Sequence, residues 1–167
     1  MIVELGGGFS PSYCKRYNSG INIDALDHEL VDIKHDLNSF PYPLEDNSVD
    51  EIYSKFFLEH VSWRVLPTFA KEMYRIIKPN GRATFIVPNF REQVKMMCRT
   101  KEWDYNDKIC MVFGDQNYDG RNWVFNAHAS SSSPELYEKL FKSVGFRYFF
   151  WDKLPNWNAD MEIVIIK

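Results

Sequence analysis

The stretch Val3-Glu4-Leu5-Gly6-Gly7-Gly8 passes from a short apolar segment directly into three consecutive glycines. The apolar residues predict a buried strand, and the glycines let the backbone turn sharply at positive φ and approach a ligand without an intervening Cβ. The next apolar stretch, Ile21-Asn22-Ile23, ends at Asp24, whose carboxylate can accept hydrogen bonds from both hydroxyls of a ribose. An ordinary glycine-rich turn would account for the glycines alone. Together with the acidic residue, they favour a nucleoside-binding α/β fold.

The composition indicates one small globular domain that works in a reducing compartment. The 167 residues suffice to bury about 70% of the unfolded surface, and 45% hydrophobic residues exclude disorder. The net charge of -3 provides no positive field, so nucleic acid is an unlikely partner. Cys14, Cys98 and Cys110 lack metal-ligand spacing, so we expect reduced thiols and no metal site. No leader precedes the first strand and no apolar run approaches the ~18 residues of a membrane span, which predicts a cytoplasmic protein with no membrane partner.

Strand-like and helix-like segments alternate along the chain. This alternation predicts a Rossmann-like, mainly parallel seven-stranded sheet with helices on both faces. The predicted strands are Ile2–Leu5, Gly20–Asp24, Leu30–His35, Glu51–Phe57, Ala83–Val87, Phe146–Trp151 and Glu162–Ile166.

Two helices have clear signals. One is predicted over residues 66–77, where apolar residues recur at helical spacing and Pro79-Asn80-Gly81 follows the end. The other is predicted over residues 134–144, between a serine cap and Gly145. Its expected buried residues are Leu136, Leu140, Phe141 and Val144.

Two stretches depart from the regular alternation. Only Phe9–Ser19 separates the first two strands, which predicts a short first helix. The segment 89–127 is long and rich in aromatic residues, so we expect an insert that serves as a lid or a substrate-binding segment. Its Trp and Tyr residues also favour a homodimer. Because no linker or repeat is found, residues 1–167 are predicted to form a single domain.

Further motifs follow the glycine turn in a fixed order. They are His35-Asp36-Leu37, the segment 40–50 (FPYPLEDNSVD), Leu58-Glu59-His60 and the segment 72–82 (EMYRIIKPNGR). In this order, and over nearly the whole chain, they resemble the class I S-adenosylmethionine-dependent methyltransferases, and within that family a subgroup of small predicted methyltransferases. The last two motifs are the most specific, because a glycine turn alone is common.

The resemblance implies S-adenosylmethionine as the cofactor and a set of residues that contact it. Glu4 would contact the cationic end of the cofactor, although an exposed charge at a strand end is the simpler alternative. Asp24 would hold the ribose and Asp36 the adenine amino group, unless Asp36 only caps a turn. The residues expected to bind the cofactor are Glu4, Gly6, Gly7, Gly8, Asp24, Asp36, Leu37 and Phe56.

Two histidines are the candidate catalytic residues. His60 would orient the methionine carboxylate of the cofactor or cap a helix, and His128 would act as a general base with a pKa near neutrality or serve in packing. Because the sulfonium carries its own leaving group, alignment alone can supply ~7 to 11 kcal/mol of catalysis. The implied reaction is methyl transfer to the oxygen or nitrogen of a small-molecule or sugar-like acceptor.

The chain departs from the family pattern at three places. Ser10 stands where a glycine is usual, and the chain begins at the strand that a helix normally precedes, which predicts an N-terminally truncated fold with looser cofactor binding. Ser54-Lys55-Phe56-Phe57 replaces the motif with which methyltransferases hold amino groups of nucleic-acid bases, so such groups are unlikely acceptors. Two alternatives stay open: a non-catalytic S-adenosylmethionine-binding or protein-interaction module and, less favoured because the third glycine is missing, an NAD-type oxidoreductase.

Overall fold

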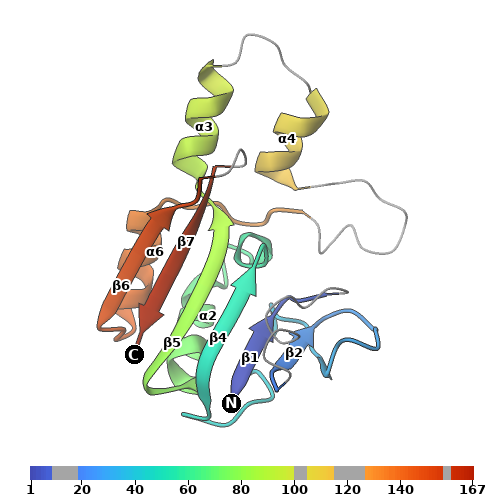
Figure 1. Ribbon diagram of the computed structural model, residues 1–167, viewed down its shortest axis with the longest axis vertical. Helices are drawn as coiled ribbons and strands as arrows, with labels where there is room; N and C mark the ends of the chain where they lie inside the picture. The colour runs from blue at the N-terminus through green and yellow to red at the C-terminus, as the bar shows by residue number, and fades with distance from the viewer. Residues whose placement is uncertain (9–18, 100–104, 115–126, 156–158) are drawn as a thin grey trace.

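A computed structural model describes residues 1–8, 19–99, 105–114, 127–155 and 159–167 (Figure 1). Its centre is a seven-stranded sheet in the order β3-β2-β1-β4-β5-β7-β6. β7 runs antiparallel to both of its neighbours, and the other four pairings are parallel. The strands are β1 Ile2–Leu5, β2 Ile21–Asp24, β3 Ile33–Lys34, β4 Val49–Lys55, β5 Ile77–Pro88, β6 Tyr148–Lys153 and β7 Asp160–Ile166. The predicted Rossmann-like sheet is confirmed.

β3 and β5 differ most from the predicted strands, and the other bounds lie within two residues of the prediction. β5 begins at Ile77 rather than Ala83, because Ile77 pairs with Val49 and the register shifts before Arg82. The turn residue Asn80 takes φ 66° and donates its N–H to the carbonyl of Lys167, so the turn stays attached to the sheet. β3 is limited to two residues, since only Ile33 and Lys34 pair with β2.

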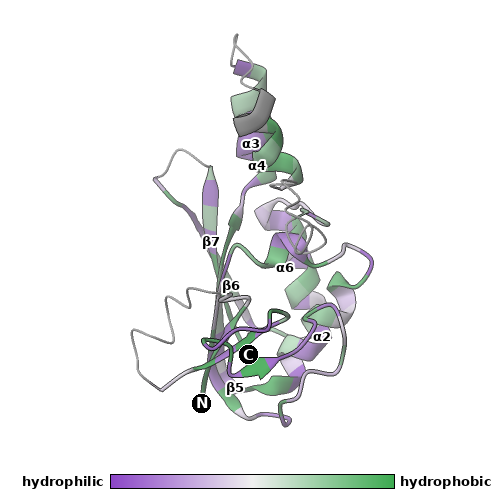
Figure 2. Cartoon of the chain, turned by 90° about the vertical axis from the view of Figure 1, so that its right-hand side faces the viewer, coloured by the Kyte–Doolittle hydropathy of each residue, from purple (hydrophilic) through white to green (hydrophobic). Residues whose placement is uncertain are grey.

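The helices occupy two positions around the sheet. α2 (Leu66–Ile76) and α6 (Pro134–Ser143) pack side by side on one face (Figure 2). α3 (Phe90–Arg99) and α4 (Tyr105–Phe113) lie beyond the ends of β4 and β5 (Figure 1). The described part of the predicted insert therefore contains two helices. No helix of the described ranges is long and apolar enough to cross a membrane.

The predicted buried face of α6 is wrong at Leu136, whereas Phe141 is buried and Leu140 and Val144 pack against the core as predicted. Tyr137 and Phe141 are buried, whereas Leu136 is 58% exposed. The rings of Phe141 and Phe85 stack with centroids 5.7 Å apart, and Tyr137 lies one helical turn earlier on the same face. Because Leu136 is adjacent to Tyr137 in the helix, it points away from the sheet.

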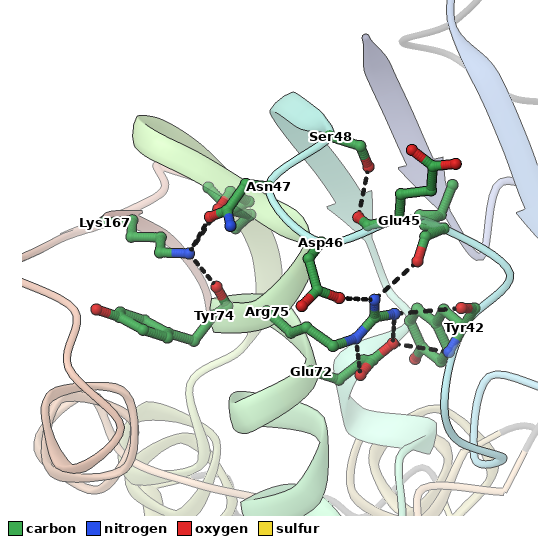
Figure 3. Close-up of polar contacts among 11 residues, drawn as sticks. Tyr42, Glu45, Asp46, Asn47, Ser48, Glu72, Tyr74, Arg75 and Lys167 are labelled. Atoms are coloured by element: carbon green, nitrogen blue, oxygen red, sulfur yellow. Dashed lines mark hydrogen bonds and ion pairs between the residues drawn. The ribbon is translucent and has the colours of Figure 1, made fainter.

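The motifs at residues 40–50 and 72–82 meet in one polar network, which we name the Arg75 clamp (Figure 3). All five N–H donors of the Arg75 guanidinium are used: they bond both oxygens of Glu72, the carbonyls of Tyr42 and Leu44, and Asp46. Glu72 is buried and also accepts the N–H of Tyr42 at 2.7 Å. The clamp therefore holds the loop before β4 against α2, and these two motifs build the fold.

Candidate active site

The carboxyl ends of β1, β2 and β4 form one edge of the sheet, because these strands are parallel. β1 has β2 on one side and β4 on the other, so the strand order reverses next to it. In open α/β sheets, ligands bind in the crevice at such a switch point. The predicted cofactor residues can be examined there one by one.

The glycine turn follows β1 and is held by the second strand. Gly6 donates its N–H to the carbonyl of Ile23 at 2.9 Å and has φ +72°. A Cβ on Gly6 would lie 2.6 Å from Cβ of Phe57, so this glycine is required by packing. Gly8 has φ +52°, and among the described residues the nearest neighbours of a Cβ there would be Leu26 and Asp24, at 3.8 and 3.9 Å. Within the described part of the chain, the turn is thus tight at Gly6 and less crowded at Gly8.

Asp24 at the end of β2 is buried and faces the glycine turn. One carboxylate oxygen accepts the N–H of Gly8 and the other that of Leu26, both at 2.9 Å. A carboxylate can accept about four hydrogen bonds, so each oxygen retains a lone pair after these contacts. Asp24 is thereby fixed in orientation and still has the acceptor capacity that a pair of ribose hydroxyls requires.

Asp36 is occupied by its own turn. Its carboxylate accepts the N–H of Asn38 at 2.9 Å and the hydroxyl of Ser39 at 3.2 Å. Leu37 is buried, and its carbonyl accepts the Tyr42 hydroxyl at 2.7 Å. In the structure, Asp36 therefore caps its own turn. A contact of Asp36 or Leu37 with adenine stays a prediction.

Phe56 and Phe57 diverge directly after β4. Phe57 is buried against the glycine turn, whereas Phe56 is exposed and takes φ 55°. A bulky residue at positive φ is strained, and such residues cluster at functional sites. The Phe56 N–H donates to the carbonyl of Ile86 at 2.9 Å, which holds the strained residue in place. The exposed ring of Phe56 therefore lies at the predicted edge.

Two polar side chains are buried beneath the glycine turn. Glu4 and Asn22 are neighbours in the register of β1 and β2, and both are almost fully buried. The side-chain N–H2 of Asn22 donates to the carbonyl of Leu30 at 2.7 Å, while its Oδ1 has no partner. Glu4 is thus an interior residue, and the expected alternative of an exposed strand-end charge is wrong.

Glu59, His60 and His128 come together at the same edge, and we name them the histidine cluster. Glu59 and His60 belong to the short 3-10 helix η1 (Leu58–His60) directly after β4. The rings of His60 and His128 lie edge to face with centroids 5.1 Å apart. Glu59 is 3% exposed, and its Oε2 has no hydrogen-bond partner.

Backbone carbonyls orient both rings of the histidine cluster. Nδ1 of His60 lies 3.0 Å from the carbonyl of Ala127, and Nδ1 of His128 lies 3.2 Å from that of Val112. The N–H of His128 also donates to the carbonyl of Phe113, at the end of α4. His128 is therefore fixed to α4, and His60 is fixed to the segment that carries His128.

Burial dominates the titration of the histidine cluster. It raises the pKa of Glu59 to about 8, with a further contribution from the charge of Asp160. It lowers the pKa of His60, and it lowers the pKa of His128 to about 4, where the neighbouring His60 acts in the same direction. The expected near-neutral pKa for His128 is therefore not observed. Both rings are neutral at pH 7.

The described part of the predicted insert also carries Arg91 and Asn89. Arg91 is exposed and pairs with Glu135 at 2.8 Å. Asn89, directly after β5, is buried, and its Oδ1 has no partner. Ser10, Cys14, Trp103, Tyr118 and Trp123 lie outside the described residues.

Sequence reasoning missed the part that Glu59 plays. The motif Leu58-Glu59-His60 carries part of the family resemblance, and only His60 in it is a predicted site residue. An acidic residue between apolar neighbours just after a strand is a usable signal, because burying an unpaired carboxylate is costly. That signal does not indicate His128, because only the fold brings His128 close to Glu59 and His60.

Comparisons with known proteins bear on the fold that carries this edge. A family model described as "Methyltransferase domain" matches residues 6–85. A search of curated proteins found no match. Among solved structures, the chain is similar to S-adenosylmethionine-dependent methyltransferases from three organisms. These are from Archaeoglobus fulgidus (TM-score 0.68, 14% identity, 99% of this chain and 85% of that one), Methanosarcina mazei (0.66, 17%, 99% and 91%) and Mesorhizobium loti (0.66, 14%, 99% and 90%). At these identities the likeness concerns the fold.

Proposed function

We propose that the chain is a class I S-adenosylmethionine-dependent methyltransferase that methylates a small-molecule or sugar-like acceptor at oxygen or nitrogen. The observation that carries the proposal is Asp24, held by two backbone N–H groups beside the glycine turn. The methyl donor supplies an activated methyl group on sulfur. The protein then has to bind the donor, orient the acceptor and exclude water.

The residues at the edge fit this cofactor. Within the described part of the chain, the less crowded Gly8 leaves room for a ligand next to the backbone, and Asp24 retains acceptor lone pairs on both oxygens. We assign Gly6, Gly7, Gly8 and Asp24 to the nucleoside and Phe56 to a flanking contact. Glu4 acts from beneath the turn as a buried acidic group near the cationic end of the donor.

We assign His60 and His128 to the acceptor side. Both rings are neutral at pH 7 and donate through Nδ1 to backbone carbonyls, so Nε2 is the acceptor atom of each. A neutral Nε2 can accept a hydrogen bond from a hydroxyl or amine and hold its lone pair in line with the methyl carbon. His128 is a weak base at its lowered pKa, so its proposed role is orientation.

We also infer a homodimer and a cytoplasmic location. β6 is an edge strand of the sheet, and Tyr148, Phe150 and Trp151 on it are exposed. An exposed aromatic edge strand favours pairing with a second copy. The exposed free thiol of Cys98 suits a reducing compartment. Sedimentation velocity tests the dimer, and Phe150→Lys should dissociate it.

The test of the proposed function is a calorimetric titration with S-adenosylmethionine and S-adenosylhomocysteine. We expect micromolar binding to the wild type and at least a hundredfold loss in Asp24→Ala, since two hydrogen bonds to a charged group are removed. Asp27→Ala is the matched control, because Asp27 is an exposed acid of the same region paired only with Lys34. Absence of heat with a folded wild-type protein would overturn the proposal. Binding without turnover on any acceptor would favour the non-catalytic module.

A further inference from the structure

We propose that Glu59, His60 and His128 bind one divalent transition-metal ion. One ligand atom from each residue lies within 4.8 Å of the other two. Zinc–ligand bonds of about 2.0 to 2.2 Å in a tetrahedral site set ligand atoms roughly 3.4 Å apart. Small rotations of these side chains would therefore close the site around an ion.

The hydrogen bonds of the two rings favour metal binding. A carbonyl oxygen only accepts, so Nδ1 of His60 and Nδ1 of His128 each carry the proton. In a neutral ring this leaves the lone pair on Nε2. Metal-ligating histidines typically donate their other N–H to a carbonyl or carboxylate, which fixes the ring and its tautomer. Both histidines already have this arrangement.

Glu59 provides an independent observation that points to a cation. Its side chain is buried, and its Oε2 has no hydrogen-bond partner. A buried polar atom of this kind is costly unless something pairs with it. The nearby charge of Asp160 adds negative potential at the same place. A bound divalent ion would replace the proton of Glu59, satisfy the unpaired oxygen and offset the charge of Asp160.

The backbone holds the three ligands together from both sides. The carbonyl of Glu59 accepts the N–H groups of Ala129 and Ser130 at 2.8 and 3.0 Å. The His128 N–H donates to Phe113 at the end of α4, and Gln93 of α3 donates to Met111 of α4. An ion at this position would therefore join the end of β4 to the pair of helices beyond the sheet.

The three metal ligands indicate which atom of the acceptor is methylated, and this step rests on the proposed function. Two histidines and one carboxylate make a three-ligand site with an open position, as in catalytic zinc centres. With the ion in place, the Nε2 lone pairs of His60 and His128 bind the metal, and the acceptor hydroxyl binds to the ion instead of to the rings. It would then release its proton to solvent more readily and be oriented for methyl transfer. The inference therefore favours an oxygen acceptor over nitrogen. The expectation of no metal site rests on cysteine spacing, which does not bear on two histidines and a glutamate.

The test titrates the metal-free, tag-free full chain with Co²⁺ and then displaces it with Zn²⁺, following the cobalt absorption bands. We expect one equivalent per chain, and a loss of affinity of at least a hundredfold in Glu59→Gln and His128→Ala. His28→Gln is the matched control, because it removes one of the four histidines from another part of the chain. Circular dichroism verifies that each variant is folded. Glu59→Gln conserves the shape of the side chain if His128→Ala does not fold.

The result that overturns the inference is a folded wild type with no stoichiometric binding, or binding that survives in Glu59→Gln and His128→Ala. S-adenosylhomocysteine is titrated separately into the chelated protein. Cofactor binding without metal binding would refute the metal site and leave the proposed function intact. Metal binding without cofactor binding would refute the proposed function and leave the metal site intact. Each proposal therefore has its own readout.

Discussion

The Arg75 clamp and the histidine cluster both contain a buried glutamate, yet they use it in opposite ways. In the clamp, Glu72 and Arg75 satisfy each other, and every N–H of the guanidinium is bonded. In the histidine cluster, Oε2 of Glu59 is buried and unpaired, and two neutral rings lie beside it. The difference indicates that the clamp stabilises the fold, whereas the cluster has bonding capacity left for a ligand.

The strongest prediction concerns the clamp. Arg75→Ala leaves the buried carboxylate of Glu72 without its partner, and breaking such a pair costs about 3–5 kcal/mol of unfolding free energy. Urea denaturation measures this loss. Lys142→Ala removes an exposed pair with Glu138 and should cost under about 0.5 kcal/mol. Equal losses in the two variants would show that the clamp is not a stabilising element.

The next prediction tests the cluster by pH, in the presence of EDTA. Because the folded pKa of Glu59 is raised from 4.5 to about 8, the folded state keeps a proton that the unfolded chain releases. Wild-type stability therefore falls as the pH rises from about 4.5 to about 8. Glu59→Gln removes this term, so it should gain on the order of 3 kcal/mol over the wild type between these limits. A difference between the two proteins that stays constant with pH would contradict the assigned burial.

Gly6 and Gly8 of the glycine turn also differ in role, one in packing and the other in ligand binding, and the expected energies are smaller. Gly6→Ala sets a Cβ against Phe57 at positive φ, and we expect a loss of roughly 2 kcal/mol. The Cβ of Gly8→Ala would make only ordinary contacts with Leu26 and Asp24, so this variant should lose about 1 kcal/mol from its positive φ. The Gly8 variant should bind S-adenosylhomocysteine more weakly at a given folded fraction. Thermal denaturation and calorimetry separate these effects, and a reversed order of stability would be inconsistent with the packing around Gly6.

The smallest effect is expected beside the clamp. Tyr42→Phe removes the hydrogen bond from the buried hydroxyl to the carbonyl of Leu37, at about 1 kcal/mol. Tyr148→Phe, on the exposed face of β6, should cost nothing measurable. Chemical denaturation of both variants checks this pair. A Tyr42→Phe protein as stable as the wild type would mean that water replaces the lost contact.

The strands were predictable because apolar runs and turns are local signals. The strand boundaries were less predictable. β5 continues through Pro79-Asn80-Gly81, because the carbonyl of Lys167, at the other end of the chain, accepts the Asn80 N–H. The buried face of α6 was also wrong at Leu136, because the position of the helix on the sheet decides which neighbour is covered. Tertiary packing overrides local spacing in such cases.

The candidate site was predictable only in part, for a similar reason. The glycine turn and Asp24 lie close in sequence and were found together. Whether His60 and His128 act together could not be read from the sequence, because the segments between them determine their distance. Their pKa values could not be predicted either, since burial sets them. The role of Asp36, in contrast, was predictable, because its turn involves only the residues that directly follow it in the sequence.

The most direct measurement is a crystal structure of the full chain with S-adenosylhomocysteine. The account predicts the ribose hydroxyls on the carboxylate of Asp24 and the sulfur directed toward His60 and His128. A nucleoside bound away from Asp24, or a sulfur that faces away from the histidine cluster, would contradict the assignment of this edge as the methyl-transfer site.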